Sequence, residues 1–386
     1  MLALPPLSLY VHIPWCVRKC PYCDFNSHEQ SGDLPQATYV KALLDDLDLD
    51  LNYAQGRELR SIFIGGGTPS LFAPQMLENL LGGIKQRLPV STALEVTMEA
   101  NPGTVEAGRF RDFRQAGVNR LSLGIQSFDN AKLKVLGRIH DASQARRAIE
   151  VAIESGFSNM NLDLMYGLPE QTPAEAIADL RQALEFSTVH LSWYQLTIEP
   201  NTGFYASPPV LPGEDEILTM QEQGLLALET AGLGRYEISA YSRPGAQSRH
   251  NLNYWQFGDY LGIGAGAHGK LTIAIDDAVL RTRKYRQPEH YLRQNLTFTA
   301  ETNRVDRAEL PLEFMLNALR LSEGFSIVEY EARTGLAFSE IRKKIEWLRD
   351  GGYLAIFNNE ANDSPRRVVP TSKGLLFANN LLEEFL

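Results

Sequence analysis

Strand-like and helix-like segments alternate along the chain up to about residue 235, and this alternation limits the folds that the chain can adopt. Short apolar runs rich in β-formers end in a Gly-, Pro- or polar-rich break, and a longer stretch of helical period follows each run. Alternating strands and helices form βαβ crossovers, which build a parallel sheet covered by helices. The pattern predicts an α/β fold with a partial (β/α)6 TIM-like barrel over residues 1–235. The predicted strands span residues 7–14, 61–69, 94–102, 121–127, 160–169 and 191–200.

Polar residues gather where the predicted strands end, and the carboxyl rim of a barrel is where its chemistry is held. A doubly wound open sheet also binds ligands at its strand ends, and the pattern alone leaves that alternative open. In either fold we expect these residues to line one mouth of the sheet. They are His12, the glycines at 65–67, Glu99, Asn101, Gln126 and Asp163.

The alternation stops after about residue 235. Residues 236–302 are rich in Gly, Tyr and His and are predicted to be a connecting segment. Residues 303–386 form a different unit, in which helical segments are followed by a short strand pair, around residues 353–359 and 367–371, and a final helix from residue 374. This order resembles a winged-helix module.

A winged helix raises the question of DNA binding. The third helix of this unit carries Arg342, Lys343 and Lys344, but the unit also has many acidic residues and no clear base-reading pattern. We therefore expect a mainly helical winged-helix-like domain that packs on the barrel or covers it.

Composition and charge narrow the choice of partners. The chain has 386 residues, 44% of them hydrophobic, and a net charge of −10, which repels a phosphate backbone and argues against nucleic acid as the main partner. No stretch approaches the run of about 20 apolar residues that a membrane span needs, and the first residues show no basic region with a cleavage site. The sequence predicts a cytoplasmic protein and leaves its oligomeric state open.

All three cysteines lie in one short segment, WCVRKCPYCDF at residues 15–25, directly after the first predicted strand. So few cysteines, so close together, cannot build a disulfide framework for a large fold, so metal or redox chemistry is the better interpretation. The spacing would also suit one face of a buried helix, but Pro21 in its middle argues against that. Thiolates are soft ligands suited to zinc, copper(I) or iron–sulfur clusters.

These metal sites differ in what they need beyond the cysteines. A structural zinc site normally has four ligands, so His12 or His28 would have to supply the fourth. Iron–sulfur clusters usually take four cysteines, so Cys16, Cys20 and Cys23 would leave one iron of a cubane open to a substrate or cofactor.

The Cys-x3-Cys-x2-Cys spacing, after a first strand and within a six-fold βα pattern, resembles that of the radical S-adenosylmethionine (SAM) enzymes. The resemblance implies that Cys16, Cys20 and Cys23 hold a [4Fe-4S] cluster whose fourth iron chelates SAM. It also implies that one electron from the cluster cleaves SAM to a 5′-deoxyadenosyl radical. The cofactor then carries the hard step, while the protein orients it and keeps water out.

Other motifs are similar to those of the oxygen-independent coproporphyrinogen-oxidase-like branch of this superfamily. The GGTP element, with Gly66, Gly67 and Thr68, is implied to lie against the methionyl part of SAM, and its glycines allow close backbone approach and offer N–H groups. Arginine can clamp a carboxylate, and Asp or Gln can bind ribose hydroxyls. Taken singly, each polar residue could equally stabilise the fold. The positions that match SAM contacts in the branch are Tyr10, Glu99, Gln126, Arg138 and Asp163.

Two features separate the groups within the branch. Oxygen-independent coproporphyrinogen III oxidases carry a further cysteine two residues after the third, where this chain has Phe25. Residues 250–255, HNLNYW, are similar to the HNxxYW motif of the haem chaperone group HemW. Neutral histidine is a common axial ligand of haem iron, so this resemblance makes His250 the candidate haem ligand, with aromatic neighbours to pack on the macrocycle.

The resemblance therefore favours a haem chaperone. Such a protein binds a [4Fe-4S] cluster, SAM and haem and passes haem to haem-accepting proteins, with membrane respiratory enzymes as candidates. The alternative is a radical enzyme that oxidatively decarboxylates coproporphyrinogen III, because the sequence retains the machinery for both. Phe25 and His250 are the residues that favour the chaperone.

Overall fold

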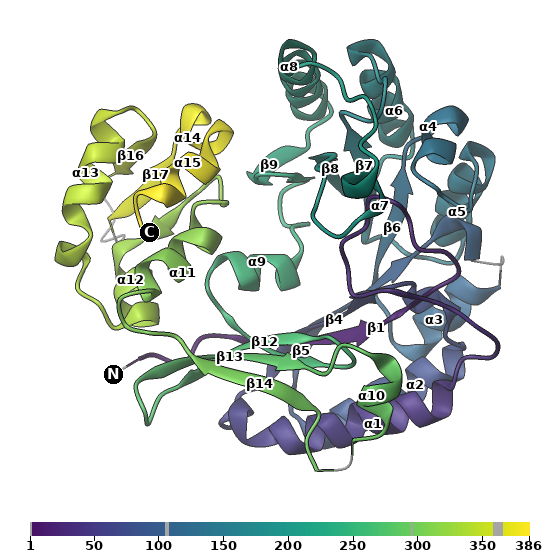
Figure 1. The fold of residues 1–386 in the computed structure, drawn as a ribbon, viewed down its shortest axis with the longest axis horizontal. Helices are drawn as coiled ribbons and strands as arrows, with labels where there is room; N and C mark the ends of the chain where they lie inside the picture. Colours follow the sequence, from purple (N-terminus) through teal and green to yellow (C-terminus); the bar gives the residue numbers. More distant parts are fainter. Residues whose placement is uncertain (1, 105–107, 295, 358–365) are drawn as a thin grey trace.

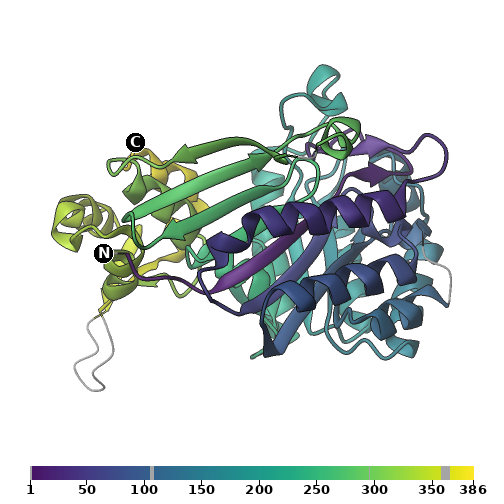
Figure 2. The ribbon, with the colours of Figure 1, turned by 90° about the horizontal axis from the view of Figure 1, so that it is seen from below.

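The computed structural model describes residues 2–104, 108–294, 296–357 and 366–386. A long mixed sheet runs through the molecule, and helices cover its outer face (Figures 1 and 2). All six predicted strands are present among the described residues, side by side and parallel. They are β1 (Leu7–Ile13), β4 (Leu59–Gly66), β5 (Val90–Ala100), β6 (Arg120–Gln126), β7 (Met160–Tyr166) and β8 (His190–Gln195).

These strands lie in the sheet in the same order as in the sequence. A doubly wound sheet reverses its strand order at a switch point, so the sequential order decides for the predicted partial (β/α)6 barrel. The crossovers between the six strands carry the predicted helices and short extra ones, and two further helices that were not predicted follow β8. The helices are α1 (Gln36–Asp50), α2 (Pro74–Arg87), α3 (Arg109–Ala116), α4 (Asn130–Val135), α5 (Ala142–Glu154), α6 (Pro173–Glu185), α7 (Gly203–Ala206) and α8 (Glu214–Thr230).

The two faces of β1 show why the sequence folds this way. Leu7, Leu9 and Val11 are fully buried in the main hydrophobic core, and each such side chain contributes about 2 kcal/mol by leaving water. The alternate residues Tyr10 and His12 point to the opposite face because side chains alternate along a strand. That opposite face is the inside of the barrel.

Helix starts in the crossovers are fixed locally. Asp141 caps α5 by accepting from the backbone N–H of Gln144, whose side chain bonds back to Asp141, and Thr172 and Glu175 form the same capping box at α6. A cap of this kind is worth about 1 kcal/mol. Both helices therefore begin where the sequence changes from a polar break to helical period.

Residues 236–302, predicted to be a connecting segment, also extend the sheet at both of its ends. The strands of this segment are hard to recognise in the sequence because glycine stands where they pack closely. A Cβ on Gly262, for example, would overlap the backbone of His268. The predicted unit boundaries near residues 235 and 303 stay a prediction. The added elements are β9 (Gly234–Glu237), β10 (Ala240–Ser242), α9 (Arg249–Trp255), β11 (Asp259–Ile263), β12 (His268–Ile273), β13 (Ala278–Lys284), α10 (Pro288–Leu292) and β14 (Thr299–Arg304).

The C-terminal residues form a helical unit with its own core, built around buried Phe314, Tyr330 and Ile345 (Figure 1, yellow-green). A small antiparallel sheet with the strand order β15, β17, β16 packs beside its helices. Residues 358 and 359 of the predicted first strand lie outside the described residues. The elements are α11 (Leu310–Ala318), β15 (Phe325–Ser326), α12 (Ile327–Thr334), α13 (Arg342–Asp350), β16 (Leu354–Phe357), β17 (Arg367–Pro370), α14 (Ser372–Leu376) and α15 (Ala378–Glu383).

The final helix predicted from residue 374 is divided into α14 and α15, which meet at Phe377. In the part of the chain that the structure describes, we find no helix with the length and apolar character needed to cross a membrane.

Candidate functional site

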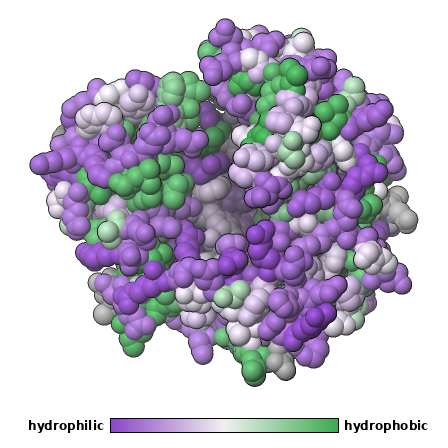
Figure 3. Space-filling model, viewed as in Figure 1, coloured by the Kyte–Doolittle hydropathy of each residue, from purple (hydrophilic) through white to green (hydrophobic). Residues whose placement is uncertain are grey.

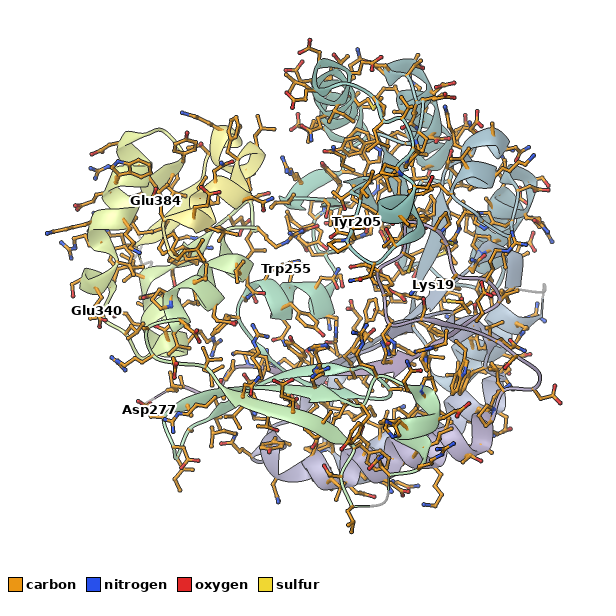
Figure 4. The ribbon with its side chains drawn as sticks, viewed as in Figure 1. Lys19, Tyr205, Trp255, Asp277, Glu340 and Glu384 are labelled. Atoms are coloured by element: carbon orange, nitrogen blue, oxygen red, sulfur yellow. The ribbon has the colours of Figure 1, made fainter. Side chains whose placement is uncertain are left out.

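A cavity of about 410 Å³ opens at the carboxyl ends of the parallel strands. The cysteine segment forms one side, strand ends of the barrel form the floor, and Asn251 and Trp255 of α9 form part of the far wall. Figure 3 shows a hollow between the C-terminal unit and the barrel, and Figure 4 shows Trp255 at the middle of this region, with Lys19 of the cysteine segment across from it. Concave sites at this end of a barrel are where ligands bind.

The three cysteines line this cavity as half-buried free thiols. Two short strands, β2 (Trp15–Cys16) and β3 (His28–Glu29), pair in parallel and close the base of the segment that carries them. The backbone N–H of Cys23 donates to the carbonyl of Cys20 at 3.1 Å, which turns the chain between the second and third thiol. The predicted ligands are thus brought together around one cavity.

The surroundings of the thiols suit metal binding more than free thiol chemistry. Burial raises the pKa of the Cys16 and Cys23 thiols, so both are protonated at neutral pH until a metal displaces the proton. Nη1 of Arg138 lies 3.7 Å from Sγ of Cys20, so the guanidinium places a positive charge beside the predicted ligands.

The zinc alternative depended on a histidine as fourth ligand. Both ring nitrogens of His12 are already bonded, Nδ1 to the hydroxyl of Tyr10 and Nε2 to the carbonyl of Asn26, each at 2.9 Å. The other candidate, His28, has no hydrogen-bond partner for Nε2 among the described residues. Within the described ranges, no group of three or more His, Cys, Asp or Glu side chains is placed to hold a single metal ion. A cubane cluster, in which each cysteine binds a different iron, suits spaced thiols better.

The glycines of the GGTP element were expected to let the backbone approach a ligand, but in the structure they let segments of the protein pack closely together. A Cβ on Gly66 would lie 2.5 Å from the His12 ring, and a Cβ on Gly67 would lie 2.5 Å from the carbonyl oxygen of Trp15. Their N–H groups are used within the protein, because Gly66 donates to Glu99 Oε2 at 3.0 Å and Gly67 to the carbonyl of Ile13 at 2.7 Å. The glycines therefore let β4 pack against the start of the cysteine segment, while Gly66, Gly67 and Thr68 still line the cavity.

Two carboxyl groups lie on the floor of the cavity. Burial, together with the charge of Asp163, raises the pKa of Glu99 to about 8. Burial also raises the pKa of Asp163, whose two oxygens accept hydrogen bonds from Ser122 Oγ at 2.9 Å and Asn161 Nδ2 at 2.8 Å. Carboxyl groups held in this way become strong partners for a cationic or hydroxyl-bearing ligand, because such a ligand offsets the cost of their burial.

Gln126 and Arg138 complete the predicted set on the cavity wall. Gln126 has a positive φ of 69°, which re-aims its side chain at the end of β6, and its Oε1 accepts from the hydroxyl of Tyr194 at 2.8 Å. Arg138 Nη2 donates to the carbonyl of Gly124 at 2.7 Å, while its buried Nε has no partner among the described residues. That unused donor is suited to an anionic group of a ligand.

Four predicted residues do not line the cavity, namely Tyr10, His12, Gly65 and His250. Tyr10 lies behind its wall, where its ring stacks on Phe63 and burial, reinforced by Glu99, raises its pKa well above the usual range. His250 is only 2% exposed and packs between Phe63 and Tyr254, with ring centroids 5.1 and 4.9 Å away. The HNLNYW segment therefore presents Asn251 and Trp255 to the cavity and turns His250 into the core.

Sequence reasoning missed several residues of the wall. Ser122, Ser192 and Tyr194 line it together with Asn251 and Trp255. The signal was present as period-two alternation, since Ser122, like Gln126, points inward from β6, and Ser192 and Tyr194 point inward from β8. Asn251 and Trp255 lie within the HNLNYW motif, whose aromatic residues were expected to pack on haem and not to line the cavity beside the cysteines.

Comparison with known proteins agrees with this geometry. A family model described as the radical SAM superfamily matches residues 10–183, and one described as the HemN C-terminal domain matches residues 305–377. The heme chaperone HemW of Escherichia coli (strain K12) is 52% identical over 386 residues, covering 100% of this chain and 100% of its own. The heme chaperone HemW of Haemophilus influenzae is 50% identical over 390 residues, covering 100% and 99%.

The chain belongs to the HemW family of radical SAM proteins. Membership of this superfamily implies a [4Fe-4S] cluster and SAM as cofactors, and the thiols, acids and buried arginine of the cavity fit both groups. Among solved structures, the coproporphyrinogen III oxidase (HemN) of Escherichia coli aligns with a TM-score of 0.81, covering 99% of this chain and 90% of its own. At 22% identity that alignment shows that the HemW family member described here shares the fold of the oxidase, and no more.

Proposed function

We propose that this protein is a cytoplasmic haem chaperone that binds a [4Fe-4S] cluster, SAM and haem and delivers haem to haemoproteins such as respiratory enzymes. The observation that carries the proposal is the 52% identity, over the full length of both chains, to a protein named heme chaperone HemW. The cavity supports the cofactor part of the proposal, because the matched motifs converge on it.

Each part of the cavity has a role in this proposal. Cys16, Cys20 and Cys23 hold the cluster, which when bound supplies an open iron and a single electron. Arg138 places its positive charge beside Cys20 and keeps one donor free for an anionic group of SAM. Glu99, Asp163 and the paired Gln126 and Tyr194 offer acceptors for the cationic and hydroxyl groups of SAM.

The protonation state of His250 suits haem ligation, but its imidazole is buried and not accessible from the cavity. Burial lowers the pKa of the imidazole to about 3, so the ring is neutral, and Nε2 has no hydrogen-bond partner in the described part of the chain. Nδ1 is bonded to Ser61 Oγ at 2.9 Å, which fixes the ring against β4. Because His250 is buried, an axial bond to haem iron requires the start of α9 to move, whereas Trp255 already presents an aromatic face to the cavity.

Haem titration tests this proposal. The purified wild type should give a saturating Soret shift at about one haem per chain. His250→Ala should weaken binding at least tenfold, because losing even a group that supports a metal ligand costs roughly 10- to 100-fold in affinity. His290→Ala removes a histidine from the exposed surface of α10 and serves as the matched control, because it should leave the titration unchanged. Absence of any Soret shift in the wild type contradicts the proposal, and an unchanged titration of His250→Ala contradicts the role of His250.

The oxidase alternative is decided by turnover. Phe25, which is 55% exposed, lines the cavity rim at the position where the related oxidases carry a further cysteine. Anaerobic incubation of the cluster-loaded protein with reductant, SAM and coproporphyrinogen III should give no protoporphyrinogen. Its formation at a rate that depends on SAM would replace the chaperone proposal by the oxidase.

A further inference from the structure

The side chain directly after the cysteine segment reaches a distant part of the sheet. Asn26 follows Phe25 and lies three residues after Cys23. Its Nδ2 donates to the carbonyl oxygens of Ala265 and Arg286, both at 2.9 Å, across sequence separations of 239 and 260 residues. These carbonyls flank β12 and β13, in the antiparallel extension of the sheet, which lies outside the 10–183 range matched by the superfamily model.

The backbone of Asn26 is fixed as well. Its carbonyl oxygen accepts from Nε2 of His12 at 2.9 Å, and Nδ1 of His12 accepts from the hydroxyl of Tyr10 at the same distance. Burial lowers the pKa of His12 to about 4, so the ring is neutral and carries its proton on the nitrogen that faces the carbonyl. Asn26 thus joins β1 to the antiparallel extension.

Gly266 packs closely against one side of the half-buried Asn26. Gly266 has a φ of +83°, and a Cβ there would overlap the Asn26 amide, so only glycine lets the chain approach this closely. The same Nδ2 of Asn26 also donates to the carbonyl of Arg286. An amide with two donors in a fixed geometry satisfies both carbonyls, which no carboxylate or aliphatic side chain can do.

The middle of the cysteine segment has a separate anchor at Pro21. The carbonyl of Pro21 accepts from the N–H of Phe204 at 2.8 Å, and Gly137 and Gly203 both pack closely against Pro21. This anchor lies beside Cys20, whereas Asp24 and Phe25, between Cys23 and Asn26, are exposed. Cys23 is therefore held on one side by the turn from Cys20 and on the other side by Asn26.

We propose that Asn26 is the positioning residue that fixes Cys23 for the cluster, and that the antiparallel extension of the sheet therefore takes part in holding the cluster. The inference rests on the proposed cluster. Its physical basis is that three thiols bind a rigid cluster most tightly when their separations are fixed in advance, so loosening one of them lowers the barrier to iron loss.

The test compares iron loss from anaerobically reconstituted proteins. Asn26→Ala removes both bonds, and Asn26→Asp keeps the shape but replaces the two donors with a carboxylate. Gln55→Ala is the matched control, because Gln55 Nε2 also ties the chain to a distant carbonyl, that of Thr272 at 2.7 Å, far from the cysteines in the sequence. The readouts are the rate at which a chelator removes iron, the EPR spectrum of the reduced cluster, and the melting temperature of the cluster-free protein.

Both Asn26 variants should lose iron about fivefold faster than the wild type, since two hydrogen bonds are lost. Their EPR spectra should be shifted or broadened, and the cluster-free melting temperatures should stay close to that of the wild type. Gln55→Ala should behave as the wild type does in iron loss and EPR. Equal iron loss and EPR spectra in the wild type and both Asn26 variants, or equally fast loss in Gln55→Ala, would overturn the inference. A wild type that retains no cluster would instead overturn the proposed function.

Discussion

Glu99 allows a specific prediction about SAM binding, because its ionisation and its position affect the same event. Burial and the neighbouring Asp163 raise its pKa to about 8, so the carboxyl group is protonated at pH 7 in the ligand-free protein. SAM carries a sulfonium cation, and a cation beside a carboxyl group favours the ionised form. Binding of SAM should therefore release a proton from Glu99 near neutral pH.

The size of the effect follows from the pKa. At pH 7, one unit below a pKa of about 8, ionising Glu99 costs about 1.4 kcal/mol, and this cost has nearly gone at pH 8.5. SAM affinity should thus rise on the order of tenfold between these two pH values. Glu99→Gln keeps an oxygen that can accept from the Gly66 N–H but cannot ionise, so this part of the rise should be absent in the variant.

The same shift affects stability, with a sign that can be checked. The folded pKa of Glu99 lies above the usual value of 4.5, so its favourable contribution is fully present below pH 4.5 and is lost as the pH rises through about 8. In the cluster-free protein, the melting temperature of the wild type should fall relative to that of Glu99→Gln across this range.

Equilibrium dialysis of SAM against anaerobically cluster-loaded protein, at pH 6.5, 7 and 8.5, measures the predicted affinity change. S-Adenosylhomocysteine, which lacks the sulfonium charge, is the ligand control and should show a smaller rise. An equal rise in the wild type and in Glu99→Gln would refute the reasoning, because the effect would then come from another group.

Two further predictions concern packing, and urea denaturation measures both. Arg320→Ala removes the ion pair between Arg320 Nη2 and buried Glu237 at 3.0 Å, and the stacking of the guanidinium on the Trp255 ring at 4.4 Å. It should lower the free energy of unfolding by about 3 kcal/mol. The control Arg243→Ala, at an exposed site, should lower it by about 0.5 kcal/mol or less. Gly224→Ala in α8 would overlap the Trp193 ring and should cost about 1–3 kcal/mol, whereas Gly82→Ala in α2 meets open space and should stabilise by up to about 1 kcal/mol. Equal effects within either pair would contradict these contacts.

The barrel could be predicted from the sequence because its signals are local. Each apolar run of strand length has a turn signal after it, and the capping residues Asp141 and Thr172 mark helix starts. The antiparallel extension of the sheet was missed because close packing there requires glycines such as Gly262, which lower strand propensity. The break between α14 and α15 at Phe377, where the backbone leaves helical geometry, has no mark in the helical period of the sequence.

The site was predictable to the extent that it follows strand ends. Glu99 and Gln126 lie at the ends of β5 and β6, and parallel strands place their ends at one rim, whereas Asp163 reaches the cavity from the middle of β7. The positions of Tyr10 and His250 could not be predicted, since alternation gives the face of a strand or helix but not what covers it. A long-range contact such as that between Asn26 and Ala265 depends on the finished fold and has no sequence signal.

Haem transfer tests the central claim most directly. The protein is loaded with one haem per chain and mixed with the haem-free form of a respiratory haemoprotein, and the Soret spectrum of the acceptor is followed over time. In a parallel sample, apomyoglobin traps haem that dissociates freely and gives the rate of passive loss. Our account predicts transfer that is faster than this passive rate and that rises with acceptor concentration, and a transfer rate equal to the passive rate at every acceptor concentration would contradict it.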